Sequence, residues 1–185
     1  MDGSTALMII DVQMAFVHRD AQGAERTTPE AERNIARLLA TFRDAGGAVI
    51  HVHHHSQQPN STFRAGLPGA EVQPFVQPVA GEAVYVKHVN SAFIGTTLES
   101  DLRATGVARL VMCGATANHC VETTARMAGN LGFDVLYVDD AVWAYGATSP
   151  DGRVFAPEEV LAMTLANLAD EFARVAPTDA VLADL

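Results

Sequence analysis

Short apolar runs alternate with amphipathic segments along nearly the whole chain. The run Ala6–Ile10 has no polar interruption, which is typical of a strand buried on both faces. Similar runs predict further strands over Ala48–His53, Ala83–Val89, Leu110–Cys113 and Asp134–Val138, with a last short strand over Arg174–Ala176. Strands of this kind, separated by helical segments, indicate an α/β domain with a mostly parallel sheet.

Apolar residues spaced three or four positions apart predict helices between the strands. These helices are expected to begin at Thr28 with Pro29 in the first turn, in the capping box Thr96–Glu99, near Asn118 and at Pro157. Residues 54–82 form a long irregular loop instead. Loops of that length in a compact domain are usually functional.

Length and composition predict one globular domain over residues 1–185. Hydrophobic residues make up 49% of the chain and charged residues 18%, which excludes a disordered protein. The net charge of −10 argues against nucleic acid or an anionic membrane surface as a partner. No apolar stretch approaches the ~20 residues that a membrane span needs.

The two cysteines of the chain, Cys113 and Cys120, form neither a CxxC pair nor a disulfide framework. They predict a reducing, cytoplasmic compartment and at most one working thiol, with Cys113 in the core. Asp2 stands where a signal peptide would be basic, and Asp11 interrupts the first apolar run. We therefore expect no signal peptide.

Three residues with chemically reactive side chains lie at or just after the ends of separate predicted strands. Asp11 comes after the first strand, Lys87 lies near the end of the third, and Cys120 follows the fourth in the first turn of a helix. Ligands of parallel sheets bind beyond the carboxyl ends of the strands, so these side chains are expected to meet at one edge.

A carboxylate, an ammonium and a thiol fit nucleophilic catalysis. A nearby cation and a helix N-terminus favour the thiolate, and Asp11 could accept the thiol proton. Taken singly, Asp11 could be a cap and Cys120 a core residue. Lys87 is harder to explain in this way, because burying an unpaired ammonium is costly. The convergence of all three on one edge therefore supports the catalytic interpretation.

The segments around these residues resemble the isochorismatase-like cysteine hydrolases, a family that includes nicotinamidases and N-carbamoylsarcosine and ureidoacrylate amidohydrolases. The resemblance is carried by Leu7–Gln13 with Phe16, Val86-Lys87 with Ser91–Phe93, Gly114–Thr116 with Cys120-Val121, and Asp140-Ala141. It implies a three-layer α/β/α, Rossmann-like domain with a mostly parallel six-stranded sheet. It also implies Asp11, Lys87 and Cys120 as the catalytic triad.

By the same resemblance, the protein is expected to be an amidase-type hydrolase of a small amide, imide or ureido substrate that acts through a thioester. A cis bond between Ala115 and Thr116 is implied, with an oxyanion hole formed by backbone groups of Thr116, Ala117 and Cys120. A homodimer or homotetramer is implied as well. The loop 142–156 supports it, because exposing its apolar side chains would leave a patch typical of interfaces; these side chains are Trp143, Tyr145, Val154 and Phe155.

Substrate contacts are expected from loop residues, although loop aromatics often only pack beneath their own loop and a loop arginine is often solvated. The candidates are Gln13, Phe16, Arg64, Phe93, Trp143 and Tyr145.

The histidines of the segment His51–His55 suggest a metal site, and nicotinamidases of this family hold a metal with Asp and His after the second strand. Here no Asp accompanies the cluster, and alternation along a strand places His51 and His53 opposite His54. We expect no metal and no cofactor.

Three alternative functions remain open. Residues 119–126 fit the HCx5R signature of cysteine phosphatases, but the segment lacks the glycine that such a phosphate loop generally needs. Hydrolysis of an isochorismate-like vinyl ether does not use a cysteine nucleophile, so Cys120 counts against it. A binding protein without catalysis could share the fold, and only the intact triad disfavours it.

Overall fold

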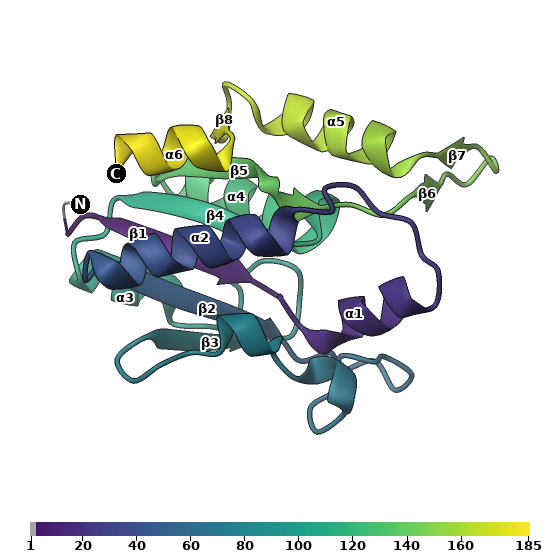
Figure 1. Cartoon of the computed structure of the whole chain (residues 1–185), viewed down its shortest axis with the longest axis horizontal. Helices are drawn as coiled ribbons and strands as arrows, with labels where there is room; N and C mark the ends of the chain where they lie inside the picture. The colour runs from purple at the N-terminus through teal and green to yellow at the C-terminus, as the bar shows by residue number, and fades with distance from the viewer. Residues whose placement is uncertain (1–2) are drawn as a thin grey trace.

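A six-stranded sheet, parallel throughout, forms the centre of the structure, a computed structural model that describes residues 3–185 (Figure 1). The strands are ordered β3-β2-β1-β4-β5-β8. Their bounds are Thr5–Ile10 for β1, Ala48–His54 for β2, Ala83–Lys87 for β3, Arg109–Ala115 for β4, Asp134–Trp143 for β5 and Arg174–Ala176 for β8. The predicted α/β class is thus confirmed; Asp2, used in the prediction about a signal peptide, lies outside the described residues.

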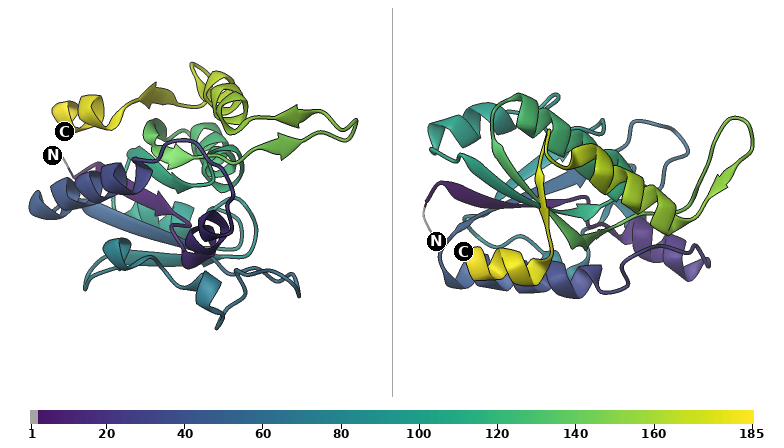
Figure 2. Two further views of the ribbon diagram at one scale, coloured as in Figure 1. Left: turned by 45° about the vertical axis from the view of Figure 1, so that its right-hand side comes forward. Right: turned by 90° about the horizontal axis from the view of Figure 1, so that it is seen from above.

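Helices cover both faces of the sheet and make the three layers (Figure 2). One face carries α2 and α6, which span Ala31–Asp44 and Thr178–Asp184; the other carries α3, α4 and α5, which span Leu98–Ala104, Glu122–Asn130 and Pro157–Leu168. A hydrophobic core lies on each face of the sheet, and alternate residues of β1 point into one core or the other. Leu7 and Ile9 face α2, whereas Met8 and Ile10 face the opposite layer. All four are buried, which explains why β1 reads as an unbroken apolar run.

Several element boundaries differ from the prediction. Helix α2 begins at Ala31 rather than Thr28, because Thr28 has a φ of 55° and its hydroxyl bonds to Thr27 instead of capping the helix. The capping box Thr96–Glu99 does not form before α3, because the N-cap residue is Thr97 and the Thr96 hydroxyl donates to the carbonyl of Ala92 at 2.6 Å.

Two short helices and one hairpin escaped prediction: α1 (Met14–Ala21), α6, and the hairpin of β6 (Ala147–Thr148) and β7 (Val154–Phe155). Helix α1 buries only Ala15 and Phe16, so its sequence carries little periodic signal. Within residues 3–185, no helix has the length and apolar character needed to cross a membrane.

Gly114 allows β4 to lie unusually close to β1. A Cβ at this position would lie 2.1 Å from the carbonyl oxygen of Ile10, and the φ of Gly114 is 119°. Any L-residue would therefore clash and adopt a disfavoured backbone conformation. This close approach places the segment after Gly114 beside the segment after Ile10, where Asp11 lies.

Candidate active site

Asp11 ends β1 with an abrupt change of backbone direction. Its φ is 52°, a left-handed value that Asp tolerates better than most residues, and its N–H donates to the carbonyl of Val52 at 2.8 Å. The turn leaves the Asp11 carboxylate buried at the carboxyl edge of the sheet.

Lys87 reaches Asp11 from two strands away. It is the last residue of β3, and β2 separates β3 from β1. Neighbouring strands lie about 4.8 Å apart, so only a long side chain can bridge this gap. Nζ of Lys87 donates to Oδ2 of Asp11 at 2.6 Å, and the two side chains are 0% and 2% exposed. Burial raises the pKa of Asp11, and the Lys87 charge opposes that rise.

Cys120 lies in a single π-helical turn, Ala117–Val121, between β4 and α4. Such turns occur frequently at functional sites. The turn follows a cis peptide bond between Ala115 and Thr116, which confirms the predicted cis bond. The hydroxyl of Tyr137 donates to the carbonyl of Ala117 at 3.0 Å and helps to fix the turn.

The Cys120 thiol shares its surroundings with Asp11 and Lys87. Burial raises the pKa of this thiol to about 12; the Asp11 charge adds to the rise and Lys87 opposes it. Among the described residues, Oδ1 of Asp11 is buried and has no hydrogen-bonding partner of ordinary geometry, while the Cys120 thiol interacts with this carboxylate. At neutral pH the Cys120 thiol therefore keeps its proton, with a proton acceptor beside it. The structure thus brings the three predicted side chains together.

Three of the expected substrate contacts are buried and have partners within the protein. Gln13 is fully buried and its amide is occupied, since Nε2 donates to the carbonyls of His54 and Ala70 while Oε1 accepts from the His54 N–H. Phe93 stacks on Phe133 in the core beneath α4, with ring centroids 5.9 Å apart. Trp143 is fully buried in the core on the α2 face. These contacts fix the three side chains within the fold.

The other expected contacts lie in loops or at α1. Phe16 packs edge-on against Phe63 and Trp143, with centroids 5.1 and 5.6 Å away. Tyr145 is buried and donates to Asp20 at 2.5 Å. Arg64 is exposed, and its guanidinium donates to a carbonyl within its own loop. Phe16, Tyr145 and Arg64 thus all contact other parts of the protein. The packing of the two aromatic rings and the exposure of Arg64 agree with the alternative that these residues only support their own loops.

The histidines divide between the two sides of β2, as alternation predicts. His51 and His53 have ring centroids 6.3 Å apart, and His51 bonds to the Glu82 carboxylate at 2.7 Å. His54 instead accepts a hydrogen bond from Nζ of Lys87, with Nδ1 and Nζ 3.3 Å apart. This contact was not predicted from the sequence, because the strand register that pairs His54 with Lys87 cannot be inferred from β2 or β3 alone.

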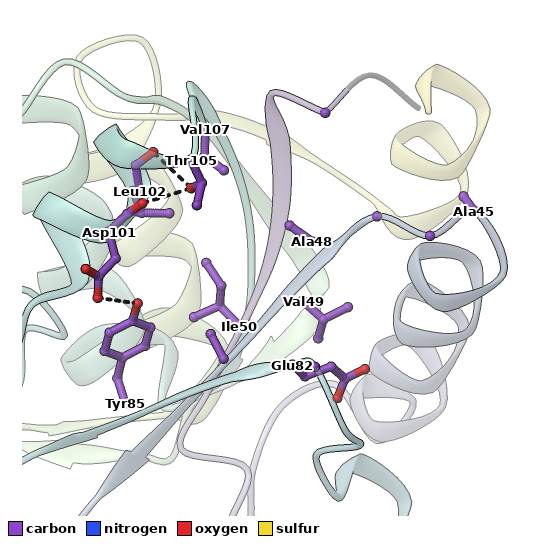
Figure 3. Close-up of a pocket in the computed structure, with 15 residues that line it drawn as sticks. Ala45, Ala48, Val49, Ile50, Glu82, Tyr85, Asp101, Leu102, Thr105 and Val107 are labelled. Atoms are coloured by element: carbon purple, nitrogen blue, oxygen red, sulfur yellow. Dashed lines mark hydrogen bonds between the residues drawn. The ribbon is translucent and has the colours of Figure 1, made fainter.

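A pocket of about 490 Å³ lies at the opposite, amino-terminal end of the strands (Figure 3). Its wall includes Ile50, Tyr85 and Leu102, and the Tyr85 hydroxyl donates to Asp101 at 2.9 Å. None of the three predicted catalytic residues lines this pocket. Its position does not fit the chemistry expected at the carboxyl edge.

The phosphatase interpretation does not fit the observed backbone. Residues 119–126 form the π-turn and the start of α4 rather than an open phosphate-binding loop. Arg126 is paired with Glu122 on the same helix, with a shortest distance of 2.8 Å. Its guanidinium therefore lies against a carboxylate instead of facing an anion-binding loop.

The six-stranded parallel sheet, with Asp, Lys and Cys side chains gathered at its carboxyl edge, matches the class of α/β protein that the sequence resembles. The Isochorismatase domain family matches residues 5–180, so the chain belongs to the isochorismatase family of hydrolases. A relative from Bacillus subtilis, the uncharacterized isochorismatase family protein YrdC, is 39% identical, and the match covers 100% of this chain and 97% of the relative.

Solved structures agree with this assignment. A family member from Chromobacterium violaceum has a TM-score of 0.93 at 43% identity, covering 98% of this chain and 93% of that one. The N-carbamoylsarcosine amidase of Thermoplasma acidophilum has a TM-score of 0.72 at 27% identity, covering 95% and 97%. The fold is therefore that of the family over nearly the whole chain.

Proposed function

We propose that this protein is a cysteine hydrolase that cleaves a C–N bond in a small amide, imide or ureido substrate through a thioester acyl-enzyme. The observation that carries the proposal is the 2.6 Å contact between buried Lys87 and Asp11, with the Cys120 thiol beside the same carboxylate. Relatives named ureidoacrylate amidohydrolase and maleamate amidohydrolase support the choice of an amide-type substrate.

In the first half-reaction, the Cys120 sulfur attacks the substrate carbonyl while the thiol proton passes to Asp11. The high pKa of this thiol favours proton transfer during the attack over a standing thiolate. Asp11 then gives the proton to the leaving nitrogen as the C–N bond breaks. Water, deprotonated by Asp11, hydrolyses the thioester, and the thiol recovers its proton.

The oxyanion formed by each attack needs preorganised donors. We assign this role to backbone N–H groups of the turn after β4, from Thr116 or Ala117 together with Cys120. The π-helical turn supports the assignment, because the first N–H groups of a helix lack partners within the helix. Lys87 adds positive charge next to the reacting carbonyl.

The thiol favours amide hydrolysis over the alternatives. Vinyl-ether hydrolysis of an isochorismate-like substrate does not use a cysteine nucleophile, whereas here a Cys lies beside an acid and a cation. A binding protein without catalysis has no need for a buried ion pair, which is costly to desolvate. We expect no metal to take part in the reaction, and two free thiols fit the predicted reducing, cytoplasmic setting.

The test is ammonia release from a panel of small amides and N-carbamoyl compounds. Cys120→Ala should abolish turnover while Cys113→Ala, the matched control at the other cysteine, stays active. Mass spectrometry of acid-quenched wild-type enzyme should find the acyl group on the Cys120 peptide. Near-normal turnover by Cys120→Ala would disprove the covalent mechanism.

We further propose that the protein forms a homodimer or homotetramer, with an interface surface that differs from the one expected from the sequence. Trp143 and Tyr145 are buried within the protomer, so they cannot form the expected apolar patch. The β6–β7 hairpin instead projects from the body (Figure 1), and its Val154 is 72% exposed. Met163 of α5, which is 62% exposed, lines one pocket together with Phe155 of β7. Light scattering should report a multimer that Val154→Asp weakens; a monomer at micromolar concentration would refute the proposal.

A further inference from the structure

His54 lies against Lys87 on the neighbouring strand. The two residues pair in the parallel register of β2 and β3, and Nζ of Lys87 is 3.3 Å from Nδ1 of His54. An ammonium has only donors, so Nδ1 must be the unprotonated, accepting nitrogen. The ring also hydrogen-bonds to the backbone of Val89, a contact that raises its pKa and therefore has the ring as donor.

The imidazole of His54 is uncharged at neutral pH. Burial lowers its pKa to about 4, and the charge of Lys87 adds to this effect. A neutral acceptor orients an ammonium without cancelling its charge. The full charge of Lys87 therefore remains available to Asp11 and to the Cys120 thiol, both of which feel it.

The backbone and the ring of His54 are both held in place. The Gln13 side chain accepts from the His54 N–H at 2.8 Å and donates to its carbonyl at 3.1 Å. The Phe63 ring packs against the imidazole at a centroid distance of 5.8 Å and an angle of 73°. Gln13 follows Asp11 by two residues. The same short segment therefore carries the Asp11 carboxylate and holds His54, the hydrogen-bond acceptor of Lys87, in place.

We propose that His54 is a positioning residue for Lys87. It accepts one N–H of the ammonium and so directs the other two toward the Asp11 carboxylate and the Cys120 sulfur. The proposal rests on the proposed function, because it assigns a role within the same site.

Substituting Asn or Leu for His54 tests the hydrogen-bond acceptor separately from the shape of the side chain. The two side chains have nearly the same outline, but only Asn can place an oxygen where Nδ1 lies. The first readout is the rate at which iodoacetamide alkylates Cys120, measured by peptide mass mapping over a range of pH. Loss of a hydrogen bond to a charged group should slow this rate by about 10- to 100-fold in His54→Leu. His54→Asn should remain within about threefold of wild type.

Three controls separate positioning from loss of structure. His55→Leu changes the next residue along, whose side chain does not contact Lys87 in the described structure, and should leave the rate unchanged. Labelling of buried Cys113 reports unfolding in every variant. If His54→Leu does not fold, His54→Phe keeps the ring while removing the acceptor and is compared with His54→Asn in the same way.

Turnover adds a second readout once the amide panel yields a substrate. His54→Leu should lower kcat with little change in KM, because Lys87 acts on the reacting atoms. Equal alkylation rates in folded His54→Leu and His54→Asn would overturn the proposal. A panel without any ammonia release would contradict the proposed function alone, since alkylation requires no amide substrate.

Discussion

Replacing Lys87 with Met should remove activity and also destabilise the fold in a pH-dependent way. Met keeps the length of the side chain, so the change removes a charge while leaving little cavity. Asp11 would then be a buried carboxylate without its cation, since both side chains are almost completely shielded from solvent. Breaking a buried pair on one side costs about 3–5 kcal/mol. That is a large part of the ~5–15 kcal/mol by which domains are stable.

The pH dependence has a definite sign. Burial already raises the pKa of Asp11 and Lys87 opposes the rise, so Lys87→Met should raise it further. Between the unfolded pKa of about 3.9 and the higher folded value, the folded state binds more protons than the unfolded state. The deficit of the variant should therefore be small at about pH 4 and grow as the pH rises.

Urea unfolding followed by circular dichroism, at several pH values, measures this deficit. The double variant Asp11→Asn/Lys87→Met leaves no charge behind and should be more stable than Lys87→Met alone, with a coupling energy of about 1–3 kcal/mol. A deficit equal at all pH values, and unchanged by Asp11→Asn, would show that Lys87 contributes packing rather than charge.

Three further outcomes are expected. Gly114→Ala should cost about 3 kcal/mol or more in urea unfolding, because its Cβ meets the Ile10 carbonyl. Gly81→Ala, with open space at a φ of 94°, is the control for a positive φ without a clash. Burial lowers the pKa of His53 from 6.5 to about 4, so the melting temperature should fall as the pH drops through this interval, and less so in His53→Phe. Exhaustive chelation should leave amide hydrolysis unchanged; a loss restored by zinc, iron or manganese would refute a metal-free reaction.

Local sequence signals were sufficient for the strands and for the residues that follow them. The unbroken apolar run of β1, the lysine at the end of β3 and the cysteine after β4 each carry their own pattern, and parallel strands bring their ends to one edge. The absence of such signals explains the misses. Helix α1 buries two side chains in a polar segment. Thr28 does not cap α2 because its backbone is in the left-handed region, next to Thr27, which exchanges hydrogen bonds with the Ala144 backbone.

Fold class and the candidates for the reactive side chains could therefore be predicted from the sequence itself, because burial on two faces and alternation of elements are local properties of the chain. Only the tertiary structure determined which of these side chains contact one another. Strand order places β2 between Asp11 and Lys87, and strand register sets His54 opposite Lys87. Order and register depend on packing between segments far apart in the chain, which a single run of residues does not encode.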